Sequence, residues 1–251
     1  MKYFGTDGIR GKYGDFEIRE PFFKALGLAA AEFVSENGGG KIVVGGDTRA
    51  STNTLKSAFC SGLMEGGAKF EDVGVLPTAL AFCVIEKGAK LGAMITASHN
   101  PYTDNGIKFF DESARKIEDE PSWRWSANWK NIWIYPWIFP SNFLPGHSGG
   151  DFASVDYCKR WRRFSRQFLK GIKIAVDMAN GATSEYPRKF LGDTGRRFLK
   201  RRILHGFNIN DGVGSQHPKI CRFLPPVGAD VGFAHDGDGD RVVVCDETSR
   251  F

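Results

Sequence analysis

The sequence predicts an α/β protein made of two tandem domains, with mixed, mostly parallel sheets that helices cover. Two observations lead to this prediction. Short apolar runs alternate with amphipathic stretches from residue 20 to residue 95, and the same alternation starts again at Gly171. The chain has 251 residues, which is long for one compact domain and comfortable for two. We expect domains at 1–150 and 151–251.

The first half of the chain shows the alternation most clearly. The expected elements are a helix at 20–37, a strand at 41–49, a helix at 51–67, a strand at 69–76, a helix at 77–88 and a strand at 90–95. Ser51 or Thr52 is a candidate N-cap of the second helix, and Pro77 suits the first turn of the third. The last strand leads into ITASHNP at 95–101, so Ser98 follows a strand end, where α/β sheets bind ligands.

The second half is less regular. Residues 171–177 read as a strand that ends at Asp177 and is followed by a turn at Asn180 and Gly181, and two apolar runs flank the loop HDGDGDR at 235–241. Residues 121–148 show no clean helical or strand period and are broken by prolines. We interpret this tryptophan-rich stretch as partly linker.

Composition argues against several classes of protein. The net charge of +5 comes mostly from residues 121–170, which contain 8 Lys and Arg against 2 Asp and Glu. The basic run at 159–168 fits a solvated helix better than a nucleic-acid surface, because no recognised nucleic-acid motif accompanies it. No secretory leader and no apolar run of membrane-spanning length is present, so we expect a cytoplasmic protein without membrane contact. The five scattered cysteines argue against a zinc site or a disulfide framework.

The loop at 235–241 carries the strongest chemical signal. Asp236, Asp238 and Asp240 alternate with glycines, so three carboxylates can converge on one cation. A calcium-binding EF-hand is the competing interpretation, but Arg241 occupies the position that requires glycine, and the flanks read as strands. Three carboxylates beside an arginine suit Mg²⁺ that shares a phosphate oxygen.

Two further residues fit phosphate chemistry. A phosphorylated Ser98 would be a phosphoryl donor whose oxygens complete a magnesium shell. Lys108 follows what reads as a glycine turn in DNGIKFF, where a desolvated amine with a lowered pKa could act as general base. Each signal alone is weak, because most serines in turns are structural and most lysines lie at the surface.

Together the motifs resemble those of the α-D-phosphohexomutases, in the same order and at similar spacing. They are FGTDGIRG at 4–11, GGDTR at 45–49, ITASHNP at 95–101, NGIKFF at 105–110, DMANGAT at 177–183, NINDGVGSQHP at 208–218 and DGDGDR at 236–241. Within that superfamily, FGTDGIRG is most similar to the phosphoglucosamine mutase family. The resemblance implies interconversion of glucosamine 6-phosphate and glucosamine 1-phosphate through a hexosamine 1,6-bisphosphate, with a hexose 1,6-bisphosphate as activator.

The resemblance also implies roles for single residues. Ser98 would be the phosphoserine and, through a phosphoryl oxygen, a ligand of Mg²⁺ together with Asp236, Asp238 and Asp240. Lys108 and Arg10 would be the acid/base and charge-stabilising pair. The expected supporting and substrate-binding residues are His99, Arg49, Asn180 and Arg241. The expected partner is a small sugar phosphate rather than nucleic acid, and the sequence does not predict the oligomeric state.

The sequence also departs from the family pattern. Family members have four domains, and nothing here resembles the sugar-recognition loop of the third or the phosphate-binding loop of the fourth. We therefore expect the 251 residues to bind Mg²⁺ weakly and to turn over no sugar phosphate. Residues 121–148, 195–206 and 221–228 fit the pattern poorly, and we interpret them as reading-frame slips in the underlying gene. A phosphomannomutase or phosphoglucomutase, and a non-catalytic fragment that binds metal, phosphate or polyanions, stay open as alternatives.

Overall fold

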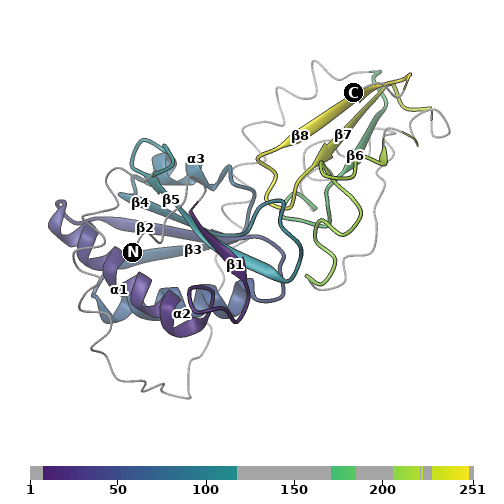
Figure 1. Cartoon of the computed structure of the whole chain (residues 1–251). Coiled ribbons are helices and arrows are strands. Elements are labelled where there is room, and N and C mark those ends of the chain that lie inside the picture. Colours follow the sequence, from purple (N-terminus) through teal and green to yellow (C-terminus); the bar gives the residue numbers. More distant parts are fainter. Residues whose placement is uncertain (1–7, 118–170, 185–205, 221, 223–227, 249–251) are drawn as a thin grey trace.

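The computed structural model describes residues 8–117, 171–184, 206–220, 222 and 228–248, which form two α/β units (Figure 1). In chain order, the elements are β1 (Ile9–Lys12), α1 (Glu20–Glu36), β2 (Lys41–Gly46), α2 (Thr52–Glu65), β3 (Lys69–Val75), α3 (Leu80–Glu86), β4 (Leu91–Ile95), β5 (Asp104–Asp111), β6 (Ile174–Asp177), β7 (Val231–His235) and β8 (Val242–Asp246). None of the described helices is long and apolar enough to cross a membrane.

The first unit is a five-stranded sheet with the order β1-β5-β4-β2-β3. Strands β3, β2 and β4 are parallel, because a helix connects each to the next, whereas β5 returns antiparallel to β4 and β1 pairs antiparallel with β5. The second unit has the order β6-β7-β8, with one parallel and one antiparallel pairing. The predicted mixed α/β sheets are confirmed, although antiparallel pairing among the described strands is as common as parallel pairing.

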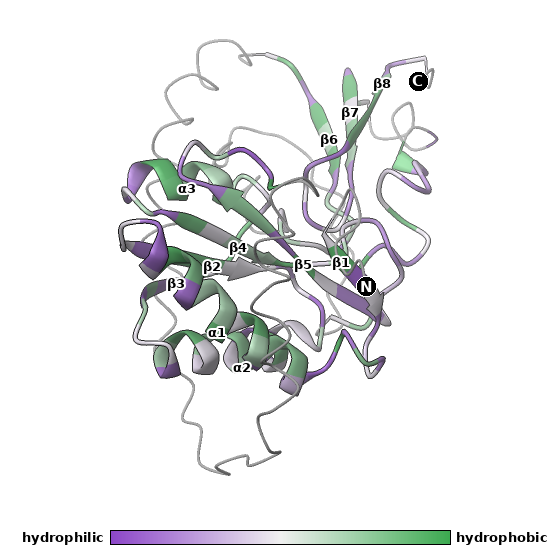
Figure 2. Ribbon diagram, turned by 60° about the vertical axis from the view of Figure 1, so that its left-hand side comes forward, coloured by the Kyte–Doolittle hydropathy of each residue, from purple (hydrophilic) through white to green (hydrophobic). Residues whose placement is uncertain are grey.

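Helices cover both faces of the first sheet. Helices α1 and α2 lie on one face and α3 lies on the other (Figure 2). Successive side chains of a strand point to opposite faces, so Ile42 and Val44 of β2 join the apolar cluster with α1 and α2, whereas Val43 joins the cluster with α3. A strand buried on both faces reads as a continuous apolar run, which explains the KIVV sequence of β2.

Glycine allows α1 and α2 to pack closely. A Cβ atom on Gly27 of α1 would lie 2.0 Å from the carbonyl oxygen of Phe59, and one on Gly62 of α2 would lie 2.0 Å from that of Lys24. Each glycine therefore contacts the backbone of the opposite helix. Any side chain at either position would force the two helices apart.

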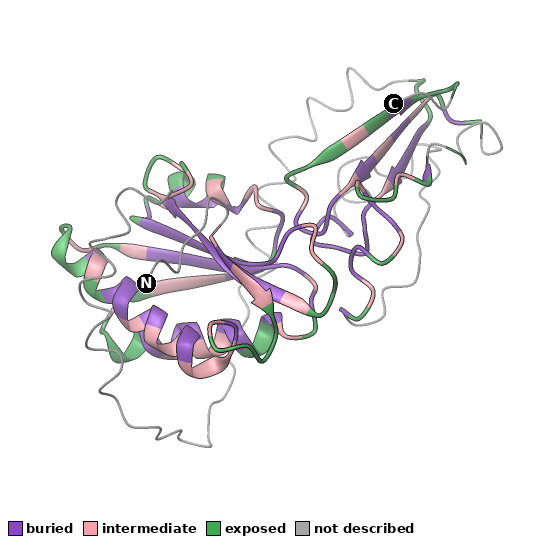
Figure 3. Cartoon of the chain, in the orientation of Figure 1, coloured by how far each residue is buried: buried purple, intermediate pink, exposed green. Residues whose placement is uncertain are grey.

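The second sheet is smaller and more exposed at its edge. Strand β6 is mostly buried, β7 alternates between buried and partly buried residues, and Val242 and Val244 of the edge strand β8 are exposed (Figure 3). Ala175, Ala234 and Cys245 pack with Ile220 and Ala229 in a small apolar cluster. This sheet holds the loop 236–241 between β7 and β8.

The structure corrects three local predictions. Ser51 occupies the N-cap position of α2 but makes no capping hydrogen bond, and its hydroxyl accepts one from Asn105 instead. Helix α3 begins at Leu80 rather than at Pro77, because residues 77–79 form a turn. DNGIKFF contains no glycine turn, because Gly106 lies inside β5, where its backbone packs closely against the backbone of β1.

Among the described cysteines, Cys60 and Cys83 are free and buried, as expected. Cys245 is disulfide-bonded, which contradicts the argument from spacing, because pairing depends on distance in the fold and not on separation in the sequence. The predicted domain boundary at 150/151, the irregular stretch 121–148 and the basic run 159–168 lie outside the described residues, as do residues 195–205.

Candidate active site and metal centre

The candidate site lies where loops at the ends of strands from the two sheets meet. Strands β2 and β4 of the first sheet end at Gly46 and Ile95, and their loops carry residues 47–49 and 96–101. Strand β7 of the second sheet ends at His235, directly before the aspartate loop 236–241. Figure 1 shows these loop-bearing ends facing each other between the two units. The carboxyl ends of parallel strands are where α/β sheets bind ligands.

Ser98 is buried at this junction in an unusual backbone conformation. Its φ is +51°, in the left-handed region, and its side chain is fully enclosed. The Ser98 backbone N–H donates to the Thr96 hydroxyl at 2.8 Å, and the Ser98 hydroxyl donates to Asp236 Oδ2 at 2.7 Å. A non-glycine residue in this region is strained, and such strain concentrates at functional sites. The structure therefore brings the predicted nucleophilic serine into contact with the predicted metal loop.

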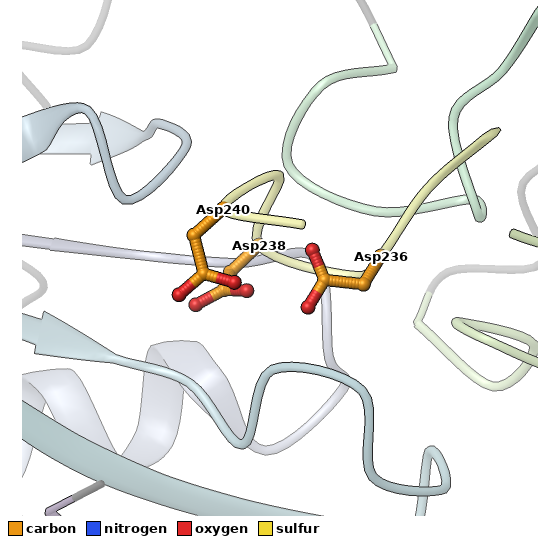
Figure 4. Close-up of side chains that lie close together, drawn as sticks. All are labelled: Asp236, Asp238 and Asp240. Atoms are coloured by element: carbon orange, nitrogen blue, oxygen red, sulfur yellow. The ribbon is translucent and has the colours of Figure 1, made fainter. Parts of the chain in front are cut away.

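The three predicted metal ligands converge. One carboxylate oxygen from each of Asp236, Asp238 and Asp240 lies within 4.8 Å of the others. Figure 4 shows Asp238 and Asp240 side by side with Asp236 facing them. Asp238 Oδ1 is buried and has no hydrogen-bond partner among the described residues. Three hard oxygen donors, one of them buried without a partner, fit Mg²⁺ or another hard divalent cation. The loop lies between strands β7 and β8, which confirms that it is not an EF-hand.

The pKa values of Asp236 and Asp238 are shifted in opposite directions. Burial, followed by the charge of Asp238, raises the pKa of Asp236 to about 7. Burial also acts to raise the pKa of Asp238, but the charge and hydrogen bond of Lys108, together with hydrogen bonds from Thr78 and Ser98, give a net downward shift. Repulsion within the cluster thus favours a positive partner.

Besides Ser98, the first unit contacts the aspartate loop through Lys108 and Thr78. Lys108 of β5 donates to Asp238 Oδ2 at 2.5 Å and to Asp240 Oδ2 at 2.9 Å. The hydroxyl of Thr78, which follows β3, donates to Asp238 Oδ2 at 2.7 Å, and its backbone N–H donates to the Asp238 carbonyl at 2.8 Å. Lys108 is buried although lysine is seldom enclosed, and the two carboxylates offset the cost.

Arg49 fixes the serine loop, residues 96–101, through hydrogen bonds to its backbone carbonyls. Its guanidinium is buried and donates to Asp47 Oδ2 at 2.9 Å, to the carbonyls of Ser98 at 2.9 Å, Asn100 at 3.0 Å and Asp104 at 2.9 Å, and to that of Pro101. All five N–H donors of the side chain are thus used inside the protein. This placement favours a structural role for Arg49 over the substrate contact that the sequence suggested.

The remaining predicted residues lie around the centre. Arg10 is in β1, opposite Gly106 and two residues from Lys108 in register, and His99 is partly buried beside Ser98. Asn180 is buried; its amide donates to the Asn208 carbonyl at 2.9 Å and its own carbonyl accepts from Thr48. The Arg241 side chain is exposed, and its backbone N–H donates to Asp236 Oδ1 at 3.1 Å. The functional roles of these four residues stay predictions.

Sequence reasoning missed three contributors. Asp47 accepts from the hydroxyls of Thr52 and Thr96 as well as from Arg49, and so connects two strand ends. Thr78 had no signal apart from its position after an apolar run. Asn210 lies within the quoted motif NINDGVGSQHP but had no assigned role, although its amide reaches the carbonyls of Ser98 and Asn100.

Comparison with known proteins agrees with this geometry. Residues 1–123 match the family described as phosphoglucomutase/phosphomannomutase, alpha/beta/alpha domain I. The chain is 36% identical over 253 residues to the phosphoglucosamine mutase of Pseudoalteromonas translucida, which covers 99% of the chain and 56% of that enzyme. It is 38% identical over 261 residues to the phosphoglucosamine mutase of Pediococcus pentosaceus, again with 56% of that enzyme covered. The chain spans little more than half the length of these relatives.

Solved structures agree on the fold. A putative phosphomannomutase from Thermus thermophilus superposes with a TM-score of 0.74 at 26% identity, over 98% of this chain and 57% of that one. A phosphoglucomutase/phosphomannomutase family protein from Burkholderia thailandensis gives a TM-score of 0.75 at 23% identity, over 99% and 55%. The motifs, the fold and the relatives agree: residues 1–123 match the phosphoglucomutase/phosphomannomutase domain I family, and the chain as a whole is similar to little more than half of the phosphoglucosamine mutases.

Proposed function

We propose that the protein is a phosphoglucosamine mutase, which interconverts glucosamine 6-phosphate and glucosamine 1-phosphate through a phosphoserine at Ser98. The observation that carries this proposal is the contact between the Ser98 hydroxyl and Asp236 at 2.7 Å, across the junction of the two units. A fully enclosed serine beside three converging carboxylates is an unusual arrangement unless a cation and a phosphoryl group belong there. The names of the relatives at 36–38% identity favour the glucosamine substrate.

The metal site fits Mg²⁺ by its donor set. Asp236, Asp238 and Asp240 would hold the ion together with a phosphoryl oxygen on Ser98, and the partnerless Oδ1 of Asp238 is available as a ligand. When bound, Mg²⁺ supplies positive charge that stabilises the oxygens of the transferred phosphoryl group. Without it, Lys108 is the described side chain whose charge offsets Asp238 and Asp240.

The chain's own residues supply the nucleophile and its position. In the forward half-reaction, the bond between Ser98 Oγ and phosphorus breaks while a sugar hydroxyl oxygen bonds to the phosphorus, and the proton of that hydroxyl passes to Ser98 Oγ, giving a sugar bisphosphate and a free serine hydroxyl. In the return half-reaction, Ser98 Oγ attacks the other phosphate, and the sugar oxygen recovers a proton. Arg49 and Thr96 fix the loop that presents Oγ, which lowers the entropic cost of both steps.

Lys108 and Arg10 are the proposed acid/base and charge-stabilising pair. The Lys108 ammonium lies against Asp238 and Asp240, at the edge of the cluster nearest β5, so it can give a proton to the sugar oxygen or neutralise charge there. Arg10 lies on the neighbouring strand β1. A guanidinium does not lose its proton near neutral pH, so Arg10 would stabilise charge rather than transfer a proton.

Phosphomannomutase or phosphoglucomutase activity is the alternative, because structural relatives have those names. The test is an assay of a version extended to the length of the relatives, alongside the 251-residue chain, with magnesium and a hexose 1,6-bisphosphate. We expect the extended version to turn over glucosamine 6-phosphate at least about tenfold faster than mannose or glucose 6-phosphate, a ratio within the range that a few specific contacts provide. A preference for mannose or glucose would contradict the substrate assignment, and unchanged turnover after Ser98→Ala would contradict the mechanism.

A further inference from the structure

We propose that Asn210 is a positioning residue for Ser98, which makes the conformation of the serine loop depend on the second unit. The inference rests on the proposed function of Ser98 for its catalytic consequence, but its geometric content stands independently. Asn210 Nδ2 donates to the Ser98 carbonyl at 2.8 Å and to the Asn100 carbonyl at 3.0 Å. The same two carbonyls accept from Arg49 Nη2. Each of the two carbonyls therefore accepts one hydrogen bond from the first unit and one from the second.

The paired donors hold a strained segment. Ser98 has a left-handed backbone, and the direction of its carbonyl is fixed together with that of its N–H, which donates to Thr96. Among the described residues of the first unit, Arg49 is the donor to this carbonyl. Asn210 adds a second donor to the same oxygen, and a carbonyl oxygen has two lone pairs to accept both. The loop is therefore over-determined, which is what allows a strained conformation to persist.

The second unit is built to bring Asn210 to this point. The Asn210 backbone N–H donates to the Ala179 carbonyl at 2.9 Å, and Asn210 itself is left-handed with φ of +60°. A Cβ atom on Gly237 would lie 2.7 Å from the Ser98 carbonyl oxygen and 2.8 Å from Asn210 Nδ2. Glycine at 237 is thus required by this contact, in addition to any need of the metal loop.

Among the described residues, two sets of hydrogen bonds join the serine loop to the second unit. One set is the hydrogen bond from the Ser98 hydroxyl to Asp236, which changes when Ser98 is phosphorylated. The other is the amide of Asn210, which contacts backbone atoms and so persists whether or not the hydroxyl carries a phosphoryl group. We infer that Asn210 keeps the serine loop in register with the aspartate loop through both states of the reaction.

Hydrogen exchange tests whether Asn210 holds the serine loop in place, and it requires no enzymatic activity. The 251-residue chain and its variant Asn210→Ala are compared by amide exchange over residues 96–101, with residues 91–95 of β4 as internal reference. We expect exchange at 96–101 to rise about tenfold in the variant, because two hydrogen bonds of ordinary net strength are lost. The isosteric Asn210→Asp replaces the donor by an acceptor and should raise exchange at least as much. Ser184→Ala removes a buried hydrogen bond to the Gly181 carbonyl in the same unit and should leave 96–101 unchanged.

The rate at which glucose 1,6-bisphosphate phosphorylates Ser98 tests the catalytic part. We expect Asn210→Ala to slow this single-turnover step by up to about 100-fold, the scale of a small misplacement of reacting groups, and Ser184→Ala to leave it within about twofold. If the wild-type chain is not phosphorylated, the proposed function fails while the exchange result still decides the role of Asn210. Unchanged exchange at 96–101 in the folded Asn210 variants would overturn the inference, as would equal changes in Ser184→Ala.

Discussion

Replacement of Arg49 by methionine removes the positive charge and all five donors from the buried serine-loop network while keeping most of the side chain's volume. The guanidinium forms a fully buried ion pair with Asp47 at 2.9 Å and donates to four carbonyls between Ser98 and Asp104. In the variant, Asp47 keeps the hydroxyls of Thr52 and Thr96 and one backbone N–H as partners, but it loses its charge partner.

The structure sets the expected magnitude. Removing one member of a buried ion pair typically costs about 3–5 kcal/mol, because an uncompensated charge remains in a low-dielectric environment. The hydroxyl partners of Asp47 place the expected value near the lower end, at about 3 kcal/mol. Since domains of this kind are stable by about 5–15 kcal/mol, the loss is a large fraction of the total.

Urea unfolding followed by circular dichroism measures this loss as a shift of the midpoint at constant slope. The control is Lys24→Met, which breaks the partly exposed Lys24–Glu65 pair of α1 and α2 and should cost less than about 1 kcal/mol. A loss below about 1 kcal/mol in Arg49→Met would refute the view that Arg49 holds the loop, and would return it to the substrate-binding role suggested by the sequence.

Three further predictions follow from single contacts. Asp238→Asn should weaken Mg²⁺ binding by more than about tenfold in titration calorimetry, whereas the control Asp246→Asn, at an exposed position, should leave it unchanged. If Asp238→Asn bound Mg²⁺ as tightly as the wild type, Asp238 would not be a ligand. Gly27→Ala should destabilise the fold by about 1–3 kcal/mol in urea unfolding, although alanine is the better helix former, because its Cβ would meet the α2 backbone; a gain in stability would contradict this close packing. The pKa of Tyr13 is raised from 10.0 to about 12, first by its hydrogen bond to the Glu20 carboxylate, then by burial and by the Glu20 charge. The hydrogen bond therefore stabilises the fold below pH of about 10 and is lost as the pH rises toward 12, and in a spectrophotometric titration Glu20→Gln should return one tyrosine to its ordinary range; an unchanged titration curve would count against the contact.

The sequence predicted the elements well wherever burial on both faces of the sheet produced continuous apolar runs, as in β2 and β4. It failed where a single backbone contact decides the outcome. Gly106 reads as a turn residue, yet it lies inside β5. Glycine is needed there because a Cβ would lie 2.2 Å from the Ile9 carbonyl oxygen of β1. No local pattern reveals that a neighbouring strand approaches this closely.

In the candidate site, too, local features could be predicted from the sequence, whereas long-range contacts could not. Asp236, Asp238 and Asp240 could be predicted from seven residues, because their convergence depends on one short loop. The contacts of Lys108 and Asn210 join residues separated by more than 100 positions, so they depend on how the two units pack. The substrate role of Arg49 came only from the resemblance of GGDTR and the other motifs to the family, and only the fold reveals that its donors point inward.

The assignment of Ser98 as a phosphoserine depends on whether this serine accepts a phosphoryl group. The purified chain is incubated with Mg²⁺ and glucose 1,6-bisphosphate, and the modified residue is mapped by mass spectrometry in the wild type, in Ser98→Ala and in Asp236→Asn. This assignment predicts one phosphoryl group on Ser98 in the wild type, none in Ser98→Ala and a strongly reduced rate in Asp236→Asn, because Asp236 contacts the hydroxyl and belongs to the candidate metal centre. Absence of phosphate from Ser98 in the folded wild type, or phosphorylation elsewhere that persists in Ser98→Ala, would contradict it.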